Sequence, residues 1–208
     1  MKIGIVGAGF VGRAIAKLAL RAGHEVMLSN SRSPNTLFSL KPMIGCEIGS
    51  SEEAVSFGDV VVLAIPMSAI NGLPVKALQY KQVIDAMNYY PERDGIIEGL
   101  ESNTLTTSEL ISRVIPTSHI TKAFNAIPMT QLEQDGSPRG ENNRRALPFA
   151  GNDEQGKKIV TQLYEEFGFE PFDVGSLSES WKFERGRPAY CVRMNKTTLE
   201  ETIKNTMR

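Results

Sequence analysis

Short apolar runs alternate along the chain with segments whose apolar residues recur at helical spacing. The clearest helical pattern covers residues 10–22, where Ala14, Ile15 and Leu18 share one face and Arg13 and Lys17 share the other. The apolar runs predict strands at 2–6, 25–28, 60–65, 83–86, 120–124, 147–150 and 170–174. Further helices are expected after Ser33-Pro34, after a capping box of Ser50 and Glu53, near 107–114 and at 153–167.

This alternation of strands and helices predicts the class of the fold. Strands separated by helices pair in parallel through right-handed crossovers, and continuous apolar strands such as 60–65 are typical of a sheet covered on both faces. We therefore predict an α/β domain with a doubly wound, mostly parallel sheet over residues 1–176. Residues 177–208 are too few for an independent domain, so we expect this C-terminal segment to pack on the sheet or on a partner subunit.

Two segments leave alternatives open. Residues 131–145 are polar and contain Gly136, Pro138 and Gly140, which predicts a long exposed loop. A loop of this kind is either a surface excursion or a lid over a site. The aromatic and basic run from Trp181 to Tyr190 either roofs a binding crevice or seals a dimer interface, because aromatic residues favour both settings.

Composition narrows the function classes. The chain has 208 residues with 23 basic and 24 acidic side chains and a net charge of -1, so it lacks the basic surplus of a protein that grips nucleic-acid phosphates. No apolar run approaches the roughly 18 residues of a membrane span, and no secretion signal is expected at Met1-Lys2. Cys46 and Cys191 are far apart, which favours a reducing, cytoplasmic setting; with only His24 and His119 besides, no metal site is expected.

The strongest chemical signal is a glycine-rich turn between the first strand and the first helix. Its sequence fits Gly-x-Gly-x-x-Gly, a pattern that indicates dinucleotide binding only in this strand–turn–helix context. The first glycine permits the tight turn, the second lets a pyrophosphate approach the backbone, and the third brings helix and strand together. The helix N-terminus then binds the phosphates. The predicted cradle consists of Gly7, Ala8, Gly9, Phe10, Val11 and Gly12.

The end of the second strand favours NADP over NAD. An NAD site usually carries a carboxylate about 20 residues beyond the glycines to hold the ribose hydroxyls. Here the chain reads Asn30, Ser31, Arg32 and Ser33, without a carboxylate. Hydroxyls and a guanidinium bind a 2′-phosphate that a carboxylate would repel. The alternative is a solvated arginine in a polar turn.

Other polar residues follow the later strands. Pro66, Asn88 and Asn125 lie at expected carboxyl ends, where open α/β sheets bind their ligands, so they should border one crevice. Each asparagine would bond a carboxamide or ribose, or else satisfy its own turn. Lys122 is expected to be a solvated residue of an edge strand, although an approach to substrate is the alternative.

Several of these motifs together resemble one family. The combination of the turn at 7–12, Ser31-Arg32, the run at 60–66 and Ala150-Gly151-Asn152-Asp153 resembles the deazaflavin-dependent NADP reductases, over most of the chain to about Leu177. It is also similar to the cytoplasmic NADPH-binding domain of the ferric reductases of the six-transmembrane epithelial antigen type.

The resemblance implies a usually dimeric Rossmann protein that transfers hydride between NADP and a flavin or deazaflavin. It places residues 8–11 at the pyrophosphate, and Ser31 and Arg32 at the 2′-phosphate. It also implies a nicotinamide side bordered by Ala64, Ile65, Pro66, Asn88, Asn125 and Met129. The Phe124-Asn125 pair departs from the form expected for the deazaflavin reductases, which puts the second substrate in doubt.

Missing residues agree with this chemistry. The chain has no Tyr followed four residues later by Lys, and too little sequence follows the sheet for the helical domain of hydroxyacid or imine reductases. Hydride exchange between stacked rings needs neither. We therefore expect an NADP(H)-dependent oxidoreductase, for which the resemblance implies a homodimer and a small-molecule acceptor such as a flavin or deazaflavin. The alternative is an NADP-binding sensor or assembly protein without turnover.

Overall fold

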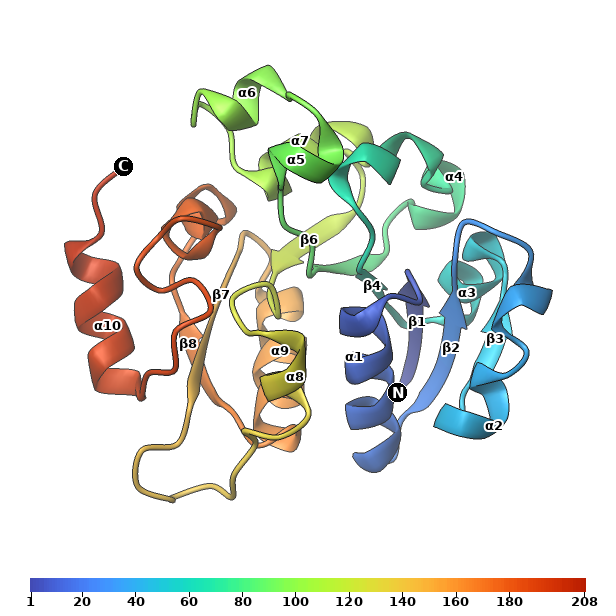
Figure 1. The fold of residues 1–208 in the computed structure, drawn as a ribbon, viewed down its shortest axis with the longest axis horizontal. Helices are drawn as coiled ribbons and strands as arrows, with labels where there is room; N and C mark the ends of the chain where they lie inside the picture. The colour runs from blue at the N-terminus through green and yellow to red at the C-terminus, as the bar shows by residue number, and fades with distance from the viewer.

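A computed structural model describes all residues from Met1 to Arg208. Eight strands form one sheet in the order β3-β2-β1-β4-β5-β6-β7-β8 (Figure 1). Their bounds are β1 Lys2–Val6, β2 Glu25–Ser29, β3 Glu47–Gly49, β4 Val60–Leu63, β5 Gln82–Asp85, β6 His119–Lys122, β7 Ala146–Gly151 and β8 Glu170–Asp173. All neighbours are parallel except β6 and β7. The predicted doubly wound, mostly parallel α/β fold is confirmed, and β3 is a strand that the sequence pattern did not reveal.

Helices cover both faces of this sheet. The main ones are α1 Phe10–Arg21, α3 Ser51–Phe57, α7 Thr107–Val114, α9 Glu154–Glu166 and α10 Lys196–Asn205. Shorter ones are α2 Leu40–Ile44, α4 Val75–Leu78, α5 Pro91–Asp94, α6 Glu98–Glu101, α8 Met129–Leu132, η1 Pro34–Leu37, η2 Met67–Gly72 and η3 Leu177–Phe183. The expected capping box of Ser50 and Glu53 is present, and Ser33 caps η1 by accepting from the Asn35 N–H.

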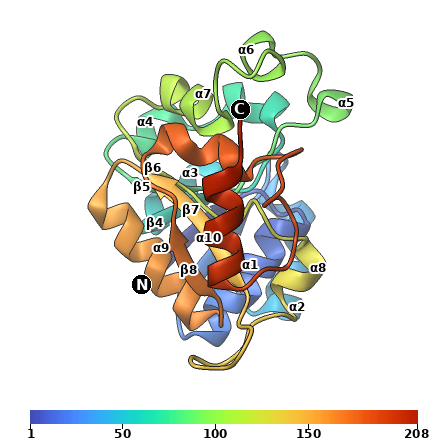
Figure 2. The same ribbon diagram turned by 90° about the vertical axis from the view of Figure 1, so that its left-hand side faces the viewer.

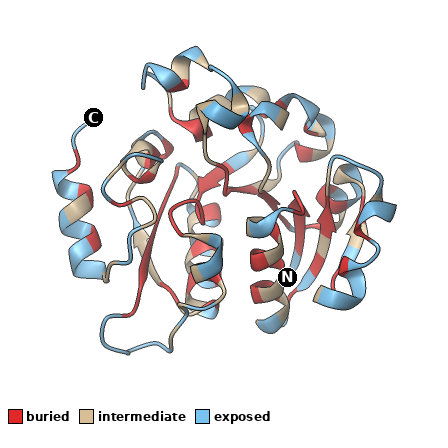
Figure 3. Cartoon of the chain, viewed as in Figure 1, coloured by how far each residue is buried: buried red, intermediate tan, exposed pale blue.

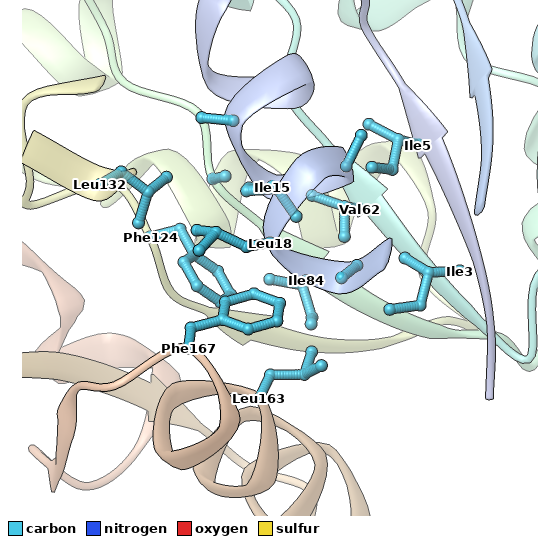
Figure 4. Packing of buried hydrophobic residues seen from close by; sticks show 14 of the residues in the cluster. Ile3, Ile5, Ile15, Leu18, Val62, Ile84, Phe124, Leu132, Leu163 and Phe167 are labelled. Carbon is cyan, nitrogen blue, oxygen red and sulfur yellow. The ribbon is translucent and has the colours of Figure 1, made fainter. Parts of the chain in front are cut away.

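Two hydrophobic cores fill the space between the sheet and the helices, one on each face. One lies between the sheet and α1, α8 and α9, where Ile15 and Leu18 of α1 lie among side chains such as Ile84, Phe124 and Phe167 (Figure 4). The other lies on the opposite face, beneath the segments from α3 to α7. The six inner strands are therefore buried along most of their length (Figure 3), as their apolar sequences predict, whereas the edge strands β3 and β8 are partly exposed.

The connection between β6 and β7 carries the single short helix α8 and reverses the direction of the chain. It enters β7 antiparallel to β6, with Lys122 opposite Ala150. It starts at Phe124, which adopts a left-handed φ of 63°. The hydroxyl of Tyr164 accepts from the Phe124 N–H and donates to the Pro148 carbonyl, so it fixes the reversal from both sides.

The segment 131–145 is only partly the exposed loop that the sequence predicts. Arg144 and Arg145 at its end are buried, and Arg145 donates to Asp135 at 2.7 Å. The Ser137 N–H donates to the Gly168 carbonyl, which ties the segment to the end of α9. Polar composition predicted exposure, but these guanidinium groups are buried against carboxylates.

Residues 177–208 pack against their own chain. Phe183, Leu199 and Ile203 form a third hydrophobic cluster with residues of β7, and α10 lies over β7 and β8 (Figure 2). None of the helices is both long and apolar enough to cross a bilayer.

Candidate functional site

Two adjoining hollows form a continuous crevice along the carboxyl ends of the central strands. Their volumes are about 290 Å³ and 280 Å³. Both are lined by Gly9, Ala64, Ile65 and Pro66, which stand at the ends of β1 and β4. We call the first the adenosine hollow and the second the ring hollow. The position agrees with the general rule that open α/β sheets bind ligands at strand carboxyl ends.

Each glycine of the turn has a distinct geometric reason. Gly7 adopts a φ of 120°, which strains any other residue, and a Cβ on Gly12 would lie 1.9 Å from the Gly7 carbonyl oxygen. A Cβ on Gly9 would meet nothing within 4 Å. Gly7 and Gly12 are therefore required by the turn itself, whereas the bare backbone at Gly9 faces open crevice, as a pyrophosphate cradle needs.

The adenosine hollow carries positive charge and no carboxylate. Its lining includes Asn30, Ser31 and Arg32 from the end of β2, as predicted, and also Arg13 from α1. The Nε of Arg13 donates to the Ala8 carbonyl at 2.7 Å, which holds its guanidinium against the glycine turn. Arg13 was assigned to the solvated face of its helix by the helical pattern. The position directly after Gly12 was the signal that could have found it.

The polar turn after β2 is ordered by its own hydrogen bonds. Asn30 Oδ1 accepts from the Arg32 N–H and its Nδ2 donates to Thr36. The side chain of Arg32 is exposed and free of hydrogen-bond partners. Ser33 does not line the hollow, because its hydroxyl caps η1.

The ring hollow is mostly apolar. Its remaining lining is Phe10, Val11, Ala86, Met87, Asn88, Tyr90, Arg93 and Met129. No Asp, Glu, His, Lys or Cys side chain lines it. The predicted Phe10, Val11, Asn88 and Met129 are brought together here. Tyr90, which from sequence could either stack on a ring or pack on apolar neighbours, also lines the hollow, whereas Ala86, Met87 and Arg93 were not expected there. An apolar hollow with few convergent polar groups is the usual setting for a planar ligand.

Asn125 does not border the crevice, contrary to the expectation. It is buried beneath Asn88, whose Nδ2 donates to the Asn125 carbonyl at 3.0 Å. The Asn125 Nδ2 donates in turn to the Phe183 carbonyl at 3.0 Å and to Asn88 Oδ1 at 3.3 Å. Asn125 does follow the end of β6, as expected, but the left-handed backbone at Phe124 redirects the chain before Asn125. Asn125 thus holds Asn88 in place rather than reaching a ligand.

Tyr90 forms the outer wall of the ring hollow. The guanidinium carbons of Arg93 and Arg185 each lie 4.8 Å from its ring centre. Its hydroxyl is hydrogen-bonded to that of Tyr190 from the C-terminal segment. Burial and the hydrogen bond to Tyr90 raise the pKa of Tyr190 above its usual range.

Lys122 is not a solvated edge residue. Strand β6 lies inside the sheet, and its Lys122 side chain is fully buried with Nζ 3.0 Å from Asp85 Oδ2. Nζ also donates to Thr107 Oγ1 and to the carbonyl of Met87, a residue of the ring hollow. This geometry also excludes the alternative that Lys122 approaches a substrate, because its ammonium group is buried beneath the crevice.

Neither candidate roof covers the crevice as proposed from the sequence. No residue of 131–145 lines either hollow, and Trp181 lines a different hollow beside Tyr89. Two residues of the aromatic and basic run, Arg185 and Tyr190, contact the crevice wall, both through Tyr90.

Residues 2–89, which carry the glycine turn and Ser31-Arg32, match the sequence model of the F420-dependent NADP oxidoreductases. The resemblance to the deazaflavin-dependent NADP reductases is confirmed. NADP is the cofactor of that family, in agreement with the choice of NADP over NAD from the turn after β2.

Relatives and solved structures extend the similarity beyond residue 89. The metalloreductase STEAP3 of Rattus norvegicus is 29% identical over 185 residues, which are 88% of this chain and 36% of the relative. The chain thus spans about a third of the length of the curated relatives that it matches.

Two solved structures share the fold over almost the whole chain. A hypothetical protein of Sinorhizobium meliloti has a TM-score of 0.81 at 28% identity, covering 94% of this chain and 95% of that one. A protein of Arthrobacter sp. FB24, proposed to be an F420-dependent NADP reductase, has a TM-score of 0.74 at 24% identity, covering 86% and 87%. The coverage by the first of these structures is high enough to include most of the C-terminal segment in the shared fold.

Proposed function

We propose that the chain binds NADP(H) in this crevice and transfers hydride between it and a flavin, a deazaflavin or a similar planar acceptor. The observation that carries the proposal is the continuity of the crevice. A glycine cradle connects a carboxylate-free hollow with two arginines to an apolar hollow without carboxylates, histidines or lysines. The family model and the similarity to the metalloreductases support the same class of reaction.

The residues of the adenosine hollow would bind and orient the cofactor. The Gly9 backbone gives the pyrophosphate room, and the free N–H groups at the start of α1 would donate to it. Arg32, with its unpaired guanidinium, and the Ser31 hydroxyl would bind the 2′-phosphate, and Arg13 adds a second positive charge nearby. Bound NADPH supplies the hydride.

The residues of the ring hollow would align two rings and exclude water. Ile65, Pro66 and Met129 provide apolar contact, and Asn88 offers a carboxamide that is held by Asn125. Tyr90 offers an aromatic wall for the acceptor. Hydride transfer demands reacting atoms about 3–3.5 Å apart and no protein proton donor, which agrees with a lining free of carboxylates and histidines.

A screen of NADPH oxidation tests this proposal. Purified protein would be mixed with NADPH and, one at a time, with flavins, a deazaflavin, quinones and ferric chelates, and absorbance of the reduced nicotinamide would be followed. Turnover with at least one planar acceptor is expected. Tight NADPH binding without any turnover would instead favour the sensor or assembly protein, and absence of NADPH binding would overturn both.

A further inference from the structure

A third hollow lies behind the wall of the crevice. Two consecutive residues after β5 separate it from the ring hollow, because Tyr90 lines the ring hollow and Tyr89 lines the third one. The other walls come from η3 and the residues after it and from the segment around α6, including Trp181, Arg187 and Leu105. Its volume is about 60 Å³. One ordered water needs about 10–15 Å³, so the space holds a small group but no planar ring.

The lining of this third hollow has an excess of positive charge. It contains the side chains of three arginines, Arg185, Arg187 and Arg208, against a single side-chain carboxylate, that of Glu184. Glu184 is already engaged, because its Oε1 accepts from both the N–H and the hydroxyl of Thr107, at 2.9 Å and 2.6 Å. Arg185 is paired with Glu92 at 2.7 Å. The other two arginines have no carboxylate partner.

These two unpaired guanidinium groups share one aromatic ring. Arg187 lies 5.0 Å and Arg208 lies 5.7 Å from the ring centre of Trp181. Arg187 donates only to the Met207 carbonyl and to Asn103 Oδ1, both neutral, which leaves further N–H donors free. Like charges held around one ring repel each other, and an anion between them removes that repulsion.

We propose that the hollow behind Tyr89 binds an anionic group, a phosphate or a carboxylate, through Arg187 and Arg208. Planar guanidinium groups hold such oxyanions with paired, charge-assisted hydrogen bonds. The anion is either free in solution or the charged end of an acceptor whose ring lies beyond Tyr90. The second source rests on the proposed function, whereas the site itself does not.

The chain offers an internal reporter for the test. Trp181 is its one tryptophan, so fluorescence excited at wavelengths that tyrosine does not absorb reports on a residue of this hollow. Inorganic phosphate would be titrated without NADPH or acceptor, and sodium chloride at equal ionic strength would serve as the blank. We expect a saturable change with phosphate only. Arg187→Gln should weaken it at least about tenfold, the usual effect of losing one charge-assisted partner.

Two further variants separate binding from folding. Arg208→Gln removes an exposed side chain without hydrogen bonds in the protein and should weaken phosphate too, while Arg113→Gln on the outer face of α7 should not. Circular dichroism would verify that each variant is folded. A response to phosphate no different from chloride, or one unchanged in both Arg187→Gln and Arg208→Gln, overturns the site.

Kinetics then distinguish the two sources of the anion. If the charged end of the acceptor occupies the hollow, Arg187→Gln should raise the KM of flavin mononucleotide but not that of riboflavin, which has no phosphate. If a free anion occupies it, both KM values stay unchanged while the fluorescence response to phosphate persists in the unmodified protein. Because the fluorescence titration needs no turnover, failure of the proposed function leaves it interpretable.

Discussion

Lys122 Nζ lies 3.0 Å from Asp85 Oδ2, and neither side chain is exposed to solvent. The pair joins the ends of β5 and β6 directly beneath the ring hollow. Asp85 also accepts from the Met87 N–H and the Ser108 hydroxyl, so its charge is fully hydrogen-bonded. Removal of one partner leaves the other buried and unpaired, which is costly in a medium of low dielectric constant.

Lys122→Met should therefore lower the free energy of unfolding by about 3–5 kcal/mol. Urea denaturation followed by circular dichroism measures this change. Lys41→Met is the matched control, because Lys41 pairs with Glu47 at 2.6 Å on the surface, where such a pair contributes less than about 1 kcal/mol. The addition of Asp85→Asn to Lys122→Met should recover part of the loss. Equal losses in the two lysine variants would contradict the buried pair.

The burial of Lys122 is a feature that the sequence alone could not predict. The alternation of strands and helices was sufficient to predict the doubly wound sheet, because hydrophobic periodicity is a local property of the chain. Whether β6 is an edge strand depends on what pairs with it, and its partner β7 begins about two dozen residues later, in antiparallel orientation. The burial of Lys122 follows from that long-range pairing, which no local pattern contains.

The glycine turn gives a second prediction. Gly9→Val should leave the protein folded, because a Cβ there meets nothing within 4 Å, but it should abolish NADPH binding by filling the pyrophosphate cradle. Calorimetric titration and the melting temperature measure the two effects. Gly72→Val is the matched control, at another exposed glycine with open space and ordinary φ, and it should bind NADPH normally. Normal binding by Gly9→Val would place the cradle elsewhere.

Cofactor selectivity gives a third prediction. NADPH at about 100 times its Kd should stabilise the protein by about 2.7 kcal/mol, and NADH should stabilise it much less. Arg32→Ala should weaken NADPH binding by about 1.5–3 kcal/mol and leave NADH unaffected, because only NADPH carries the 2′-phosphate. Thermal shift measurements with both cofactors check this. Arg139→Ala, in the exposed part of the 131–145 segment, is the control; equal protection of the unmodified protein by NADH and NADPH would refute the assignment.

The candidate site was predictable where one local segment supplies the chemistry. Gly7, Gly9 and Gly12 lie within a single strand–turn–helix unit, which is enough to identify them as a dinucleotide-binding turn. Arg32 follows the next strand. Asn125 was misplaced because the left-handed backbone at Phe124 redirects the chain after β6. The contact between Tyr90 and Tyr190 brings together residues that are 100 positions apart, which only the packing of residues 177–208 on the sheet decides.

The ion pair between Arg185 and Glu92 gives a prediction about pH. The hydrogen bonds from Arg185 lower the pKa of Glu92 from 4.5 to about 2. A carboxylate whose pKa is lower in the folded state stabilises the fold above its unfolded pKa, and this contribution is lost as the pH falls through the folded value. At pH 3 Glu92 should still be ionised in the unmodified protein but mostly protonated in Arg185→Gln. Carbon-detected NMR of the Glu92 carboxyl group measures this directly, with Arg113→Gln as the control that leaves the titration unchanged. Arg185 also lies over the Tyr90 ring, which forms the outer wall of the ring hollow. Because the same variant removes this contact, Tyr90 should be held less firmly, and the KM of the acceptor should rise more than the KM of NADPH. An unchanged Glu92 titration in Arg185→Gln would show that the ion pair does not form in solution, and an unchanged KM of the acceptor would show that Arg185 does not hold this wall.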